Sequence, residues 1–365
     1  MIPNPSSIRR LRLGTFIFGW IALFSFFLAP VGQAATDKIV ERGPFMFDTS
    51  KLKVSEFVGR LTVEVRDAAG MELTLSGPEE ELDRVEFDAS GDTLVLDYKQ
   101  RDWSLFRSWS KKPRVTIKVS EGTAVKIEKM IGRLRVGDTH APFELRLVSG
   151  NAKIGAVSEA NVTIKGSGDV DIKAVAGRFE GTVMGSGDLD VGNAGPSEIK
   201  LMGSGDISVG TINGDLEAMT AGSGEVTIGK VVGDINFSGA GSGDCMISGG
   251  KAQDLKLLAA GSGDIKFGGS AVGEIEIASA GSATISVNSV EGKLKASIKG
   301  SGDIMIAEGR AKPLHVEIRG SGNFEFDGIA EDADLYIKGS GDIRIREVNG
   351  SIKQRTKGSG TIDIG

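Results

Sequence analysis

Apolar and polar residues alternate along most of the chain beyond residue 35. Pairs of apolar residues separated by a single position recur, as in Val170/Ile172 and Leu189/Val191. Alternation with a period of two predicts short β-strands that bury one face. Between residues 35 and 145 the same alternation is less regular, as in Thr93–Leu96 and Arg114–Val119. The pattern therefore predicts an all-β fold.

A Gly-Ser-Gly turn, or a close variant of it, recurs between these strands at intervals of 18 to 20 residues. The copies begin at Gly166, Gly185, Gly203, Gly222, Gly241, Gly261, Gly281, Gly300, Gly320, Gly339 and Gly358. Each unit holds a strand, the glycine turn, a second strand and a second turn, with no room for a helix. One unit cannot bury its own apolar face, whereas stacked copies bury a continuous one. This predicts a parallel β-helix (a solenoid) with about 19 residues per coil. A blade or meander arrangement is the alternative, although it needs longer repeats.

The first residues have the pattern of a secretory signal peptide. Arg9, Arg10 and Arg12 precede an apolar run from residue 13 to 30, and small residues follow up to Ala34. These are the three regions of a signal peptide, and an uncleaved membrane anchor is the alternative. The chain is therefore expected to be exported, to the periplasm, the outer surface or the medium.

The expected organisation has three parts: a signal peptide at 1–34, a less regular β region at 35–145, and the Gly-Ser-Gly repeat β-helix at 146–365. The segment Asp88–Asp92 contains an early Ser-Gly-Asp turn between two predicted strands. Since this turn has the chemistry of the later repeats, the solenoid is expected to begin well before residue 145.

Charge and cysteine content narrow the function classes. The formal net charge is −6, and removal of 1–34, with three arginines and no acids, changes it to −9. A mildly acidic exported protein is a poor candidate for binding nucleic acid, which requires basic clusters. The one cysteine, Cys245, rules out a disulfide framework and is expected to be a small buried residue in the column of Val170 and Ile207.

An acidic residue usually follows the glycine turn, which predicts a column of carboxylates about 5 Å apart along the stack. Like charges at that distance repel one another. The favoured interpretation is that each Asp bonds nearby backbone amides and caps its turn. The alternative is calcium binding, although the known calcium-binding β-roll has a much shorter repeat. The candidate metal ligands are Asp169, Asp188, Asp206, Asp244 and Asp264.

A second candidate site lies at residues 101–114, where aromatic and basic residues alternate in an otherwise acidic protein. Trp103, Phe106, Arg107 and Trp109 are the candidate binding residues. Aromatic anchors beside basic residues suit a membrane interface, a glycan or a protein partner. The competing interpretation, slightly favoured, is a loop that covers the open end of the solenoid.

Catalysis has little support in the sequence, and no catalytic residue is assigned. The two histidines, His140 and His315, are far apart and lack the spacing of metal ligands. The repeated serines have no histidine nearby in sequence, and they do not lie between a strand and a helix as the serine of a nucleophile elbow does. A carbohydrate-active enzyme is kept as an alternative, because some solenoid enzymes place carboxylates on one face.

The chain resembles the putative auto-transporter adhesin head GIN domain family of exported bacterial proteins. The segments that carry the resemblance are Val63–Val65, Leu82–Val85, Gly91–Val95, Val115–Val119 and the Gly-Ser-Gly-Asp series. The resemblance implies a β-helix, a location in the cell envelope or at the surface, and adhesion; it brings no catalytic residues. We therefore expect a non-catalytic structural or adhesive module that binds glycans, surface proteins or copies of itself. The alternatives are a carbohydrate-active enzyme or a calcium-dependent glycan-binding solenoid.

Overall fold

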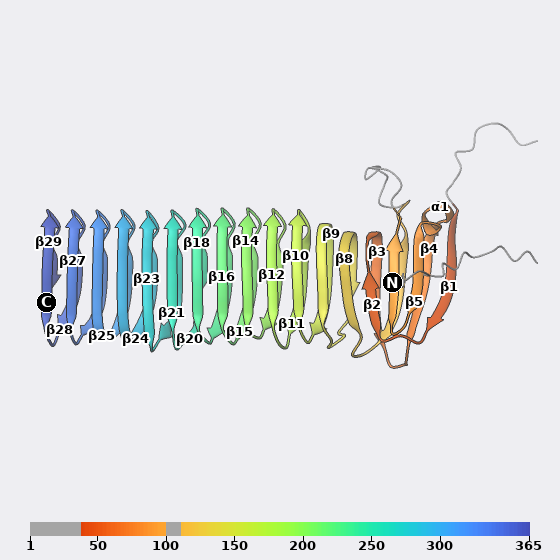
Figure 1. Cartoon of the computed structure of the whole chain (residues 1–365), viewed down its shortest axis with the longest axis horizontal. Coiled ribbons are helices and arrows are strands. Elements are labelled where there is room, and N and C mark those ends of the chain that lie inside the picture. Colours follow the sequence, from red (N-terminus) through yellow and green to blue (C-terminus); the bar gives the residue numbers. More distant parts are fainter. Residues whose placement is uncertain (1–37, 100–110) are drawn as a thin grey trace, which may run out of the picture.

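The computed structural model describes residues 38–99 and 111–365, and it is a long β-solenoid (Figure 1). It is nearly all-β, with 73% strand and 2% helix, and it has about 13 turns of about 19 residues. The predicted fold class and coil length are thus confirmed. The described residues include no helix with the length and apolar character needed to cross a membrane. The predicted signal segment lies outside the described residues.

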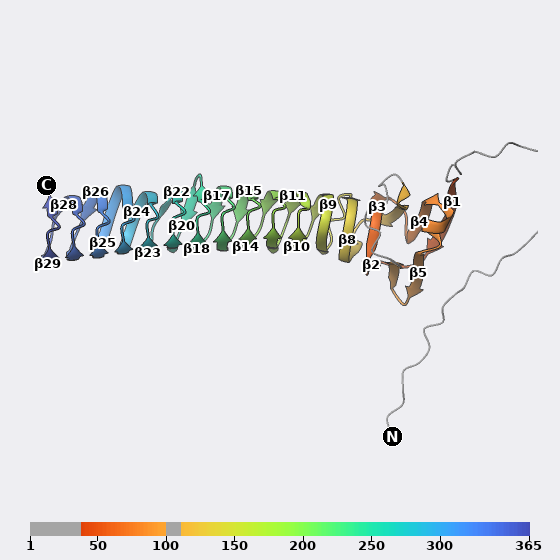
Figure 2. The same ribbon diagram turned by 90° about the horizontal axis from the view of Figure 1, so that it is seen from above.

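Each regular coil contains two strands joined by a Gly-Ser-Gly turn. In the first complete coil these are β10 (Ala160–Gly166) and β11 (Asp169–Val175). Strand β12 (Phe179–Gly185) returns to the first face and pairs in parallel with β10, so that Val162 lies opposite Gly181 and Ile164 opposite Val183. Repetition of this step builds two parallel ladders that face each other (Figure 2).

The later strands continue both ladders to the last residue. The strands that follow β12 are β13 (Leu189–Ala194), β14 (Ser197–Gly203), β15 (Ile207–Asn213), β16 (Leu216–Gly222), β17 (Val226–Val232), β18 (Ile235–Gly241), β19 (Cys245–Ile247), β20 (Gly250–Ala252), β21 (Leu255–Gly261), β22 (Ile265–Ala271), β23 (Glu274–Gly281), β24 (Ile285–Gly300), β25 (Ile304–Gly320), β26 (Phe324–Ala330), β27 (Ala333–Gly339), β28 (Ile343–Val348), β29 (Ile352–Gly358) and β30 (Ile362–Ile364).

The core is a set of straight columns of inward-facing apolar residues. Val170, Ile207, Val226 and Cys245 occupy one such column, and all four side chains are buried. Burial of this apolar surface on every coil is the main force that holds the stack together. The prediction that Cys245 is a small core residue in the column of Val170 and Ile207 is confirmed.

Both glycines of the Gly-Ser-Gly turn are required by the stacking. Gly339 has a φ of +147°, and a Cβ there would stand 1.9 Å from the carbonyl oxygen of Gly320 in the preceding coil. Gly341 has no positive φ, yet a Cβ on it would stand 2.0 Å from the oxygen of Gly322. Residues with a side chain rarely adopt the first conformation, and neither position has room for a Cβ. The turn backbones of successive coils therefore contact one another directly.

The N-terminal end is assembled out of chain order. Strands β2 (Lys51–Val54) and β3 (Phe57–Arg66) form a coil that stacks in parallel on β8 (Ala124–Val136). On the other side the same coil pairs with β6 (Thr93–Tyr98) and β7 (Arg114–Ser120). Strand β8 stacks in turn on β9 (Phe143–Val157), so parallel stacking extends well before residue 145. The predicted domain boundaries themselves stay predictions.

Antiparallel strands cover this end of the solenoid (Figure 2). Strand β4 (Met71–Pro78) pairs antiparallel with β7, and β1 (Ile39–Phe47) pairs antiparallel with β4. A short helix, α1 (Glu79–Leu82), follows β4 and was not expected from the strand pattern of this region. The early Ser-Gly-Asp turn joins β5 (Val85–Ser90) to β6 in an antiparallel hairpin, not in a coil.

Candidate functional site

The acidic residues after the glycine turns form a ladder of hydrogen bonds between coils. The Oδ1 atom of each aspartate in this column accepts the backbone N–H of the equivalent residue one coil later, whereas Glu225 accepts the hydroxyl of Thr227 instead. Asp188 accepts from Asp206 at 3.0 Å, Asp244 from Asp264 at 2.8 Å and Asp264 from Thr284 at 2.8 Å. The remaining two predicted ligands behave alike, with Asp206 at 2.8 Å and Asp169 at a longer 3.4 Å. The five predicted residues therefore do lie in one column.

The hydrogen bonds of this ladder offset the repulsion expected between stacked carboxylates. Hydrogen bonds to the charged form lower the pKa of a carboxyl. The pKa of Asp342 is lowered, first by the hydroxyl of Thr361 at 2.7 Å and then by the backbone N–H of Thr361 at 2.8 Å. Where carboxylates crowd without such donors the shift is opposite. Burial and then the charges of Asp171, Asp188 and Asp169 raise the pKa of Asp190.

A second ladder of the same kind lies at the other turn of several coils, and it was not found in the sequence. Asp215 Oδ1 accepts the N–H of Asp234 at 2.9 Å, and Asp234 Oδ1 accepts that of Asp254 at 3.0 Å. Asp254 accepts from Glu274 at 2.9 Å, while Asp332 accepts from both the N–H and the hydroxyl of Ser351. Within these parts of the stack, carboxylates at both turns thus join one coil to the next.

The carboxylate column has the geometry of turn capping, in which each Oδ1 already holds a backbone N–H. In the described part of the chain, no three His, Cys, Asp or Glu side chains are grouped so that they could hold a metal ion. Calcium binding by Asp169, Asp188, Asp206, Asp244 and Asp264 stays a prediction.

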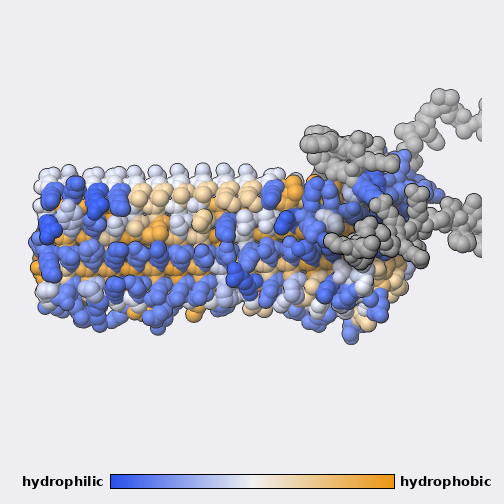
Figure 3. Space-filling view, viewed as in Figure 1, coloured by the Kyte–Doolittle hydropathy of each residue, from blue (hydrophilic) through white to orange (hydrophobic). Residues whose placement is uncertain are grey.

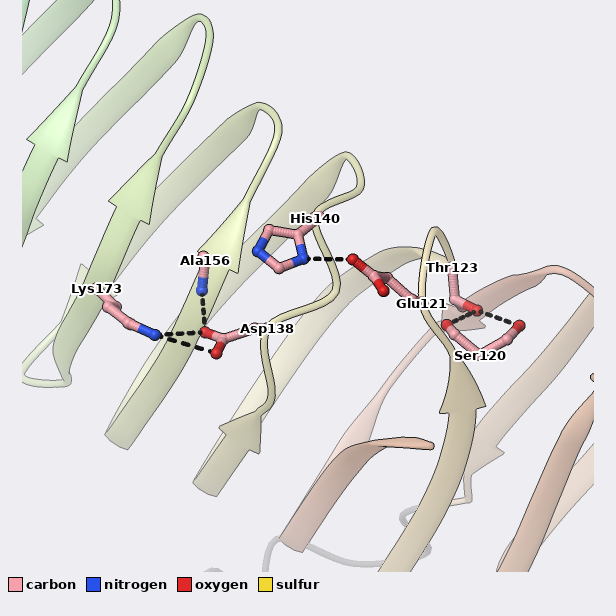
Figure 4. Close-up of polar contacts among 7 residues, drawn as sticks. All are labelled: Ser120, Glu121, Thr123, Asp138, His140, Ala156 and Lys173. Carbon is pink, nitrogen blue, oxygen red and sulfur yellow. Dashed lines mark hydrogen bonds and ion pairs between the residues drawn. The ribbon is translucent and has the colours of Figure 1, made fainter. Parts of the chain in front are cut away.

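The irregular turns at the N-terminal end carry a distinct polar cluster (Figure 4). Asp138 Oδ1 accepts the N–H of Ala156 at 2.6 Å, and its Oδ2 lies 3.0 Å from Nζ of Lys173. These bonds lower the pKa of Asp138, the backbone donor having the largest effect. His140 lies beside it with a φ of 49° and contacts Glu121 Oε1 at 2.8 Å. The cluster fixes three coils to one another.

The histidines and serines are not arranged for nucleophilic catalysis within the described residues. Nδ1 of His140 contacts Glu121, and Nδ1 of His315 lies 3.4 Å from Asp334. Ser120, the serine drawn in Figure 4, contacts Thr123. Burial raises the pKa of the Cys245 thiol, which keeps it protonated and unreactive. Each histidine thus has a carboxylate partner, without a serine that it could activate.

The second predicted site is the segment at residues 101–114, where aromatic and basic residues alternate. Trp103, Phe106, Arg107 and Trp109 lie at 100–110, outside the described residues. The strands that flank them, β6 and β7, belong to the coil next to the antiparallel cover. Both interpretations of this segment, a binding site and a cap, therefore stay predictions.

An open groove of about 540 Å³ crosses the starts of β2, β8, β9 and β10. Its floor includes the buried side chains of Val125 and Phe143. Charged residues on its rim are already paired, since Lys51 lies 3.5 Å from Asp92 and Lys126 lies 2.7 Å from Glu144. The groove combines an apolar floor with a rim whose charges neutralise one another.

The outward side chains fall into straight rows, because residues of successive coils pair without offset along most of the stack. One row consists of the residue directly before each glycine turn. It begins with an exposed lysine, continues with methionines and alanines, and ends with four basic residues. Its members are Lys165, Met184, Met202, Ala221, Ala240, Ala260, Ala280, Lys299, Arg319, Lys338 and Lys357. Figure 3 shows it as a pale stretch with blue ends, next to the near-white row of turns.

Comparison with known proteins gives one family and several structures of related shape. The model of the family described as "Putative auto-transporter adhesin, head GIN domain" matches residues 50–230, 191–307 and 304–365. Comparison with curated proteins gives no match.

Three solved structures illustrate the structural likeness, each covering 90% of this chain. A putative adhesin from Bacteroides fragilis is 15% identical, with 98% of its own chain covered and a TM-score of 0.23. A putative adhesin from Parabacteroides distasonis is 15% identical, with 98% covered and a TM-score of 0.31. A putative lipid binding protein from the same species is 17% identical, with 96% covered and a TM-score of 0.22. At these values the structures carry no functional argument for this chain.

Proposed function

Because the chain belongs to the family of the putative auto-transporter adhesin head GIN domain, we propose that it is an exported, non-catalytic module of the bacterial envelope that acts by adhesion. In this proposal the solenoid is a rigid rod, and its outer faces bind a partner through many equivalent positions at once. The partner classes that we consider are glycans, surface proteins and other copies of the chain.

The observation that carries the proposal is the straightness of the outward rows. Lys299, Arg319 and Lys338 lie directly opposite one another on consecutive coils, as do Ala240, Ala260 and Ala280 elsewhere in the row. A surface that repeats at the strand spacing of about 4.8 Å suits a repetitive ligand, because each added coil contributes another contact of the same kind. A row of this kind provides many weak contacts in a line.

The rigidity needed for such a surface comes from the coil contacts already described. Side-chain ladders at two turns, the contacts between turn backbones and the continuous core fix each coil to its neighbours. A binding surface held in place before contact loses little conformational entropy when it binds. The acidic side chains of the ladders thus stabilise the solenoid, and the outward rows provide the surface that binds a partner.

Export and surface display can be tested by protease shaving of intact cells that express the full chain. Antibodies would follow the protein beside a periplasmic control protein. Degradation of the protein while the control survives would support surface adhesion. Protection until the outer membrane is opened would favour a periplasmic scaffold and contradict the adhesin.

A further inference from the structure

We propose that the basic end of the outward row, formed by Lys299, Arg319, Lys338 and Lys357, binds a linear anionic polysaccharide laid along the axis of the rod. The inference rests on the proposed adhesive function and specifies its partner. We refer to these four residues as the basic row.

The basic row brings like charges together in a protein that is acidic overall. The four residues pair in direct register across four consecutive coils, and all four side chains are exposed. Strands in a sheet lie about 4.8 Å apart, and like charges directly opposite each other destabilise the pairing. The net charge of the chain is −6, so the row stands out from its surroundings.

Several other basic residues of the solenoid are paired with acids of a neighbouring coil. Lys293 pairs with Glu274, Arg344 with Glu325 and Arg346 with Asp327. In the basic row, Arg319 contacts only Glu317 of its own strand, at 2.7 Å. No described residue forms an ion pair or hydrogen bond with the side chains of Lys299, Lys338 or Lys357. The basic row has no such ion pair to a neighbouring coil among the described residues, which leaves its cations available to a partner.

The basic row is a single line in which all four positions are basic, and this linear shape indicates the kind of partner. The rows beside it on the same strands carry both signs, since Glu317 shares its row with Arg355 and Asp334 shares its row with Lys353. A broad anionic surface such as a membrane would meet these carboxylates together with the cations. An extended chain lying along a single row would contact the cations and avoid the acids. Regularly spaced anionic groups on a polysaccharide match a regularly spaced row of cations.

The alanine stretch of the same row is an uncharged counterpart of the basic row. Over Ala221, Ala240, Ala260 and Ala280 the backbone register is unchanged, but the side chains carry no charge. Figure 3 shows this pale stretch continuing into the blue end of the row. Basic residues placed on the alanine stretch should therefore extend the site without altering the scaffold.

The test uses the purified protein and measures its affinity for polygalacturonate, with neutral dextran as the uncharged glycan. We expect polygalacturonate to bind and dextran not to bind. The variant Lys299→Gln/Lys338→Gln/Lys357→Gln should bind about tenfold or more weakly, because binding of a polyanion depends on the number of cations that contact it. The variant Ala260→Lys/Ala280→Lys should bind more tightly, and salt should weaken all of this binding.

The matched control is Lys312→Gln/Arg344→Gln/Arg346→Gln, which removes three positive charges from nearby coils outside the row. These residues have acidic partners, namely Glu291, Glu325 and Asp327. Thermal melting would verify that every variant is folded. Affinity of the control variant close to that of the unaltered protein supports the basic row as the site.

Three results would overturn the proposal. They are equal losses in both triple variants, no binding of polygalacturonate by the unaltered protein, and a preference for phosphatidylglycerol vesicles or single-stranded DNA over the polysaccharide. None of these results depends on where the protein lies in the cell. Protease shaving reports on surface display separately, so failure of this proposal is distinguishable from failure of the adhesive function.

Discussion

The ring of Phe326 fills the space that a Cβ on Gly328 would occupy, with Cε2 only 2.3 Å from the Cβ position. The same relationship joins Phe267 to Gly269, where the nearest ring atom lies at 2.7 Å. Phe179/Gly181 and Phe237/Gly239 repeat it at 2.8 and 3.1 Å. A large core side chain is thus accommodated by the absence of a side chain two residues later.

Gly328→Ala is therefore expected to destabilise the protein by about 1–3 kcal/mol, the usual cost of overpacking a core. Adding Phe326→Val should recover part of this loss, because the smaller side chain frees the space. Urea unfolding of both single variants and the double variant gives the coupling. Additive effects in that cycle would contradict the steric relationship.

Gly339→Ala tests the contact between turn backbones. It combines a φ of +147° with a Cβ 1.9 Å from the oxygen of Gly320, and we expect a loss of about 1–3 kcal/mol or more. Gly249→Ala is the matched control, because nothing lies within 4 Å of a Cβ at that position. Thermal and urea unfolding would compare the two, and equal stability would show that the turns do not need glycine.

Asp264 tests the carboxylate ladder. Asp264→Ala removes the acceptor of the Thr284 N–H and should cost about 0.5–1.5 kcal/mol. Asp264→Asn keeps an acceptor oxygen and should cost less, since Asn323 already fills this role naturally and accepts from Asp342 at 3.1 Å. Urea unfolding of both variants checks the order. A larger loss for the Asn variant would show that negative charge, and not hydrogen bonding, is what the position requires.

Acid should weaken the stack. Hydrogen bonds from Thr361 and Ser351 hold the pKa values of Asp342 and Asp332 below their usual range in the folded protein. Their contribution to stability is therefore full above the unfolded pKa of about 3.9, and it is lost as the pH falls through the lower folded values. We expect the Tm to fall from pH 4 towards pH 2, as measured by circular dichroism. The variant Asp332→Asn/Asp342→Asn should show a shallower fall, and parallel curves would contradict the ladder's role.

Calcium offers a direct test of the alternative for Asp169, Asp188, Asp206, Asp244 and Asp264. We expect millimolar calcium to leave the Tm unchanged, because Oδ1 of each carboxylate already accepts a backbone N–H. A ligand that binds only the folded state must raise the Tm. A rise that a chelator abolishes would establish calcium binding and support the glycan-binding alternative that depends on it.

The solenoid could be predicted from the sequence because the glycine turns and the buried apolar residues recur with the same period. The alternation of Val170/Ile172 and the recurring glycine turns specify strands, turns and coil length together. The sequence was insufficient at the N-terminal end, where residues 51–66 pair with segments that lie beyond them in the chain. Nothing in a local pattern specifies which distant strand will be a neighbour. Helix α1, only four residues long, is too short to show a helical period.

Two side-chain rows were missed for a different reason. The second carboxylate ladder was visible as an Asp recurring at the other turn, as at Asp215, Asp234 and Asp254. The basic row was visible as Lys or Arg directly before Gly-Ser-Gly at residues 299, 319, 338 and 357. Both are single positions within a repeat of about 19, so each becomes visible only when the copies are aligned with one another. For the second ladder, turn geometry has no simple period from which the hydrogen bonds could be deduced. For the basic row, strand alternation does place the cations outward, directly after the buried Ile298, Ile318 and Ile337.

The placement of residues 51–66 between two later segments makes the two parts of the rod differ in the sequence separation of their contacts. A coil in the regular part needs only the coil made just before it, so residues 146–365 can be added one turn at a time as the chain emerges. The segment 51–66 finds neither neighbour until residues 93–136 have been synthesised. The N-terminal end is therefore a cluster of long-range contacts, which form more slowly than contacts between adjacent coils. Whole coils can be gained or lost within residues 146–365 without changing the contacts that hold this end together.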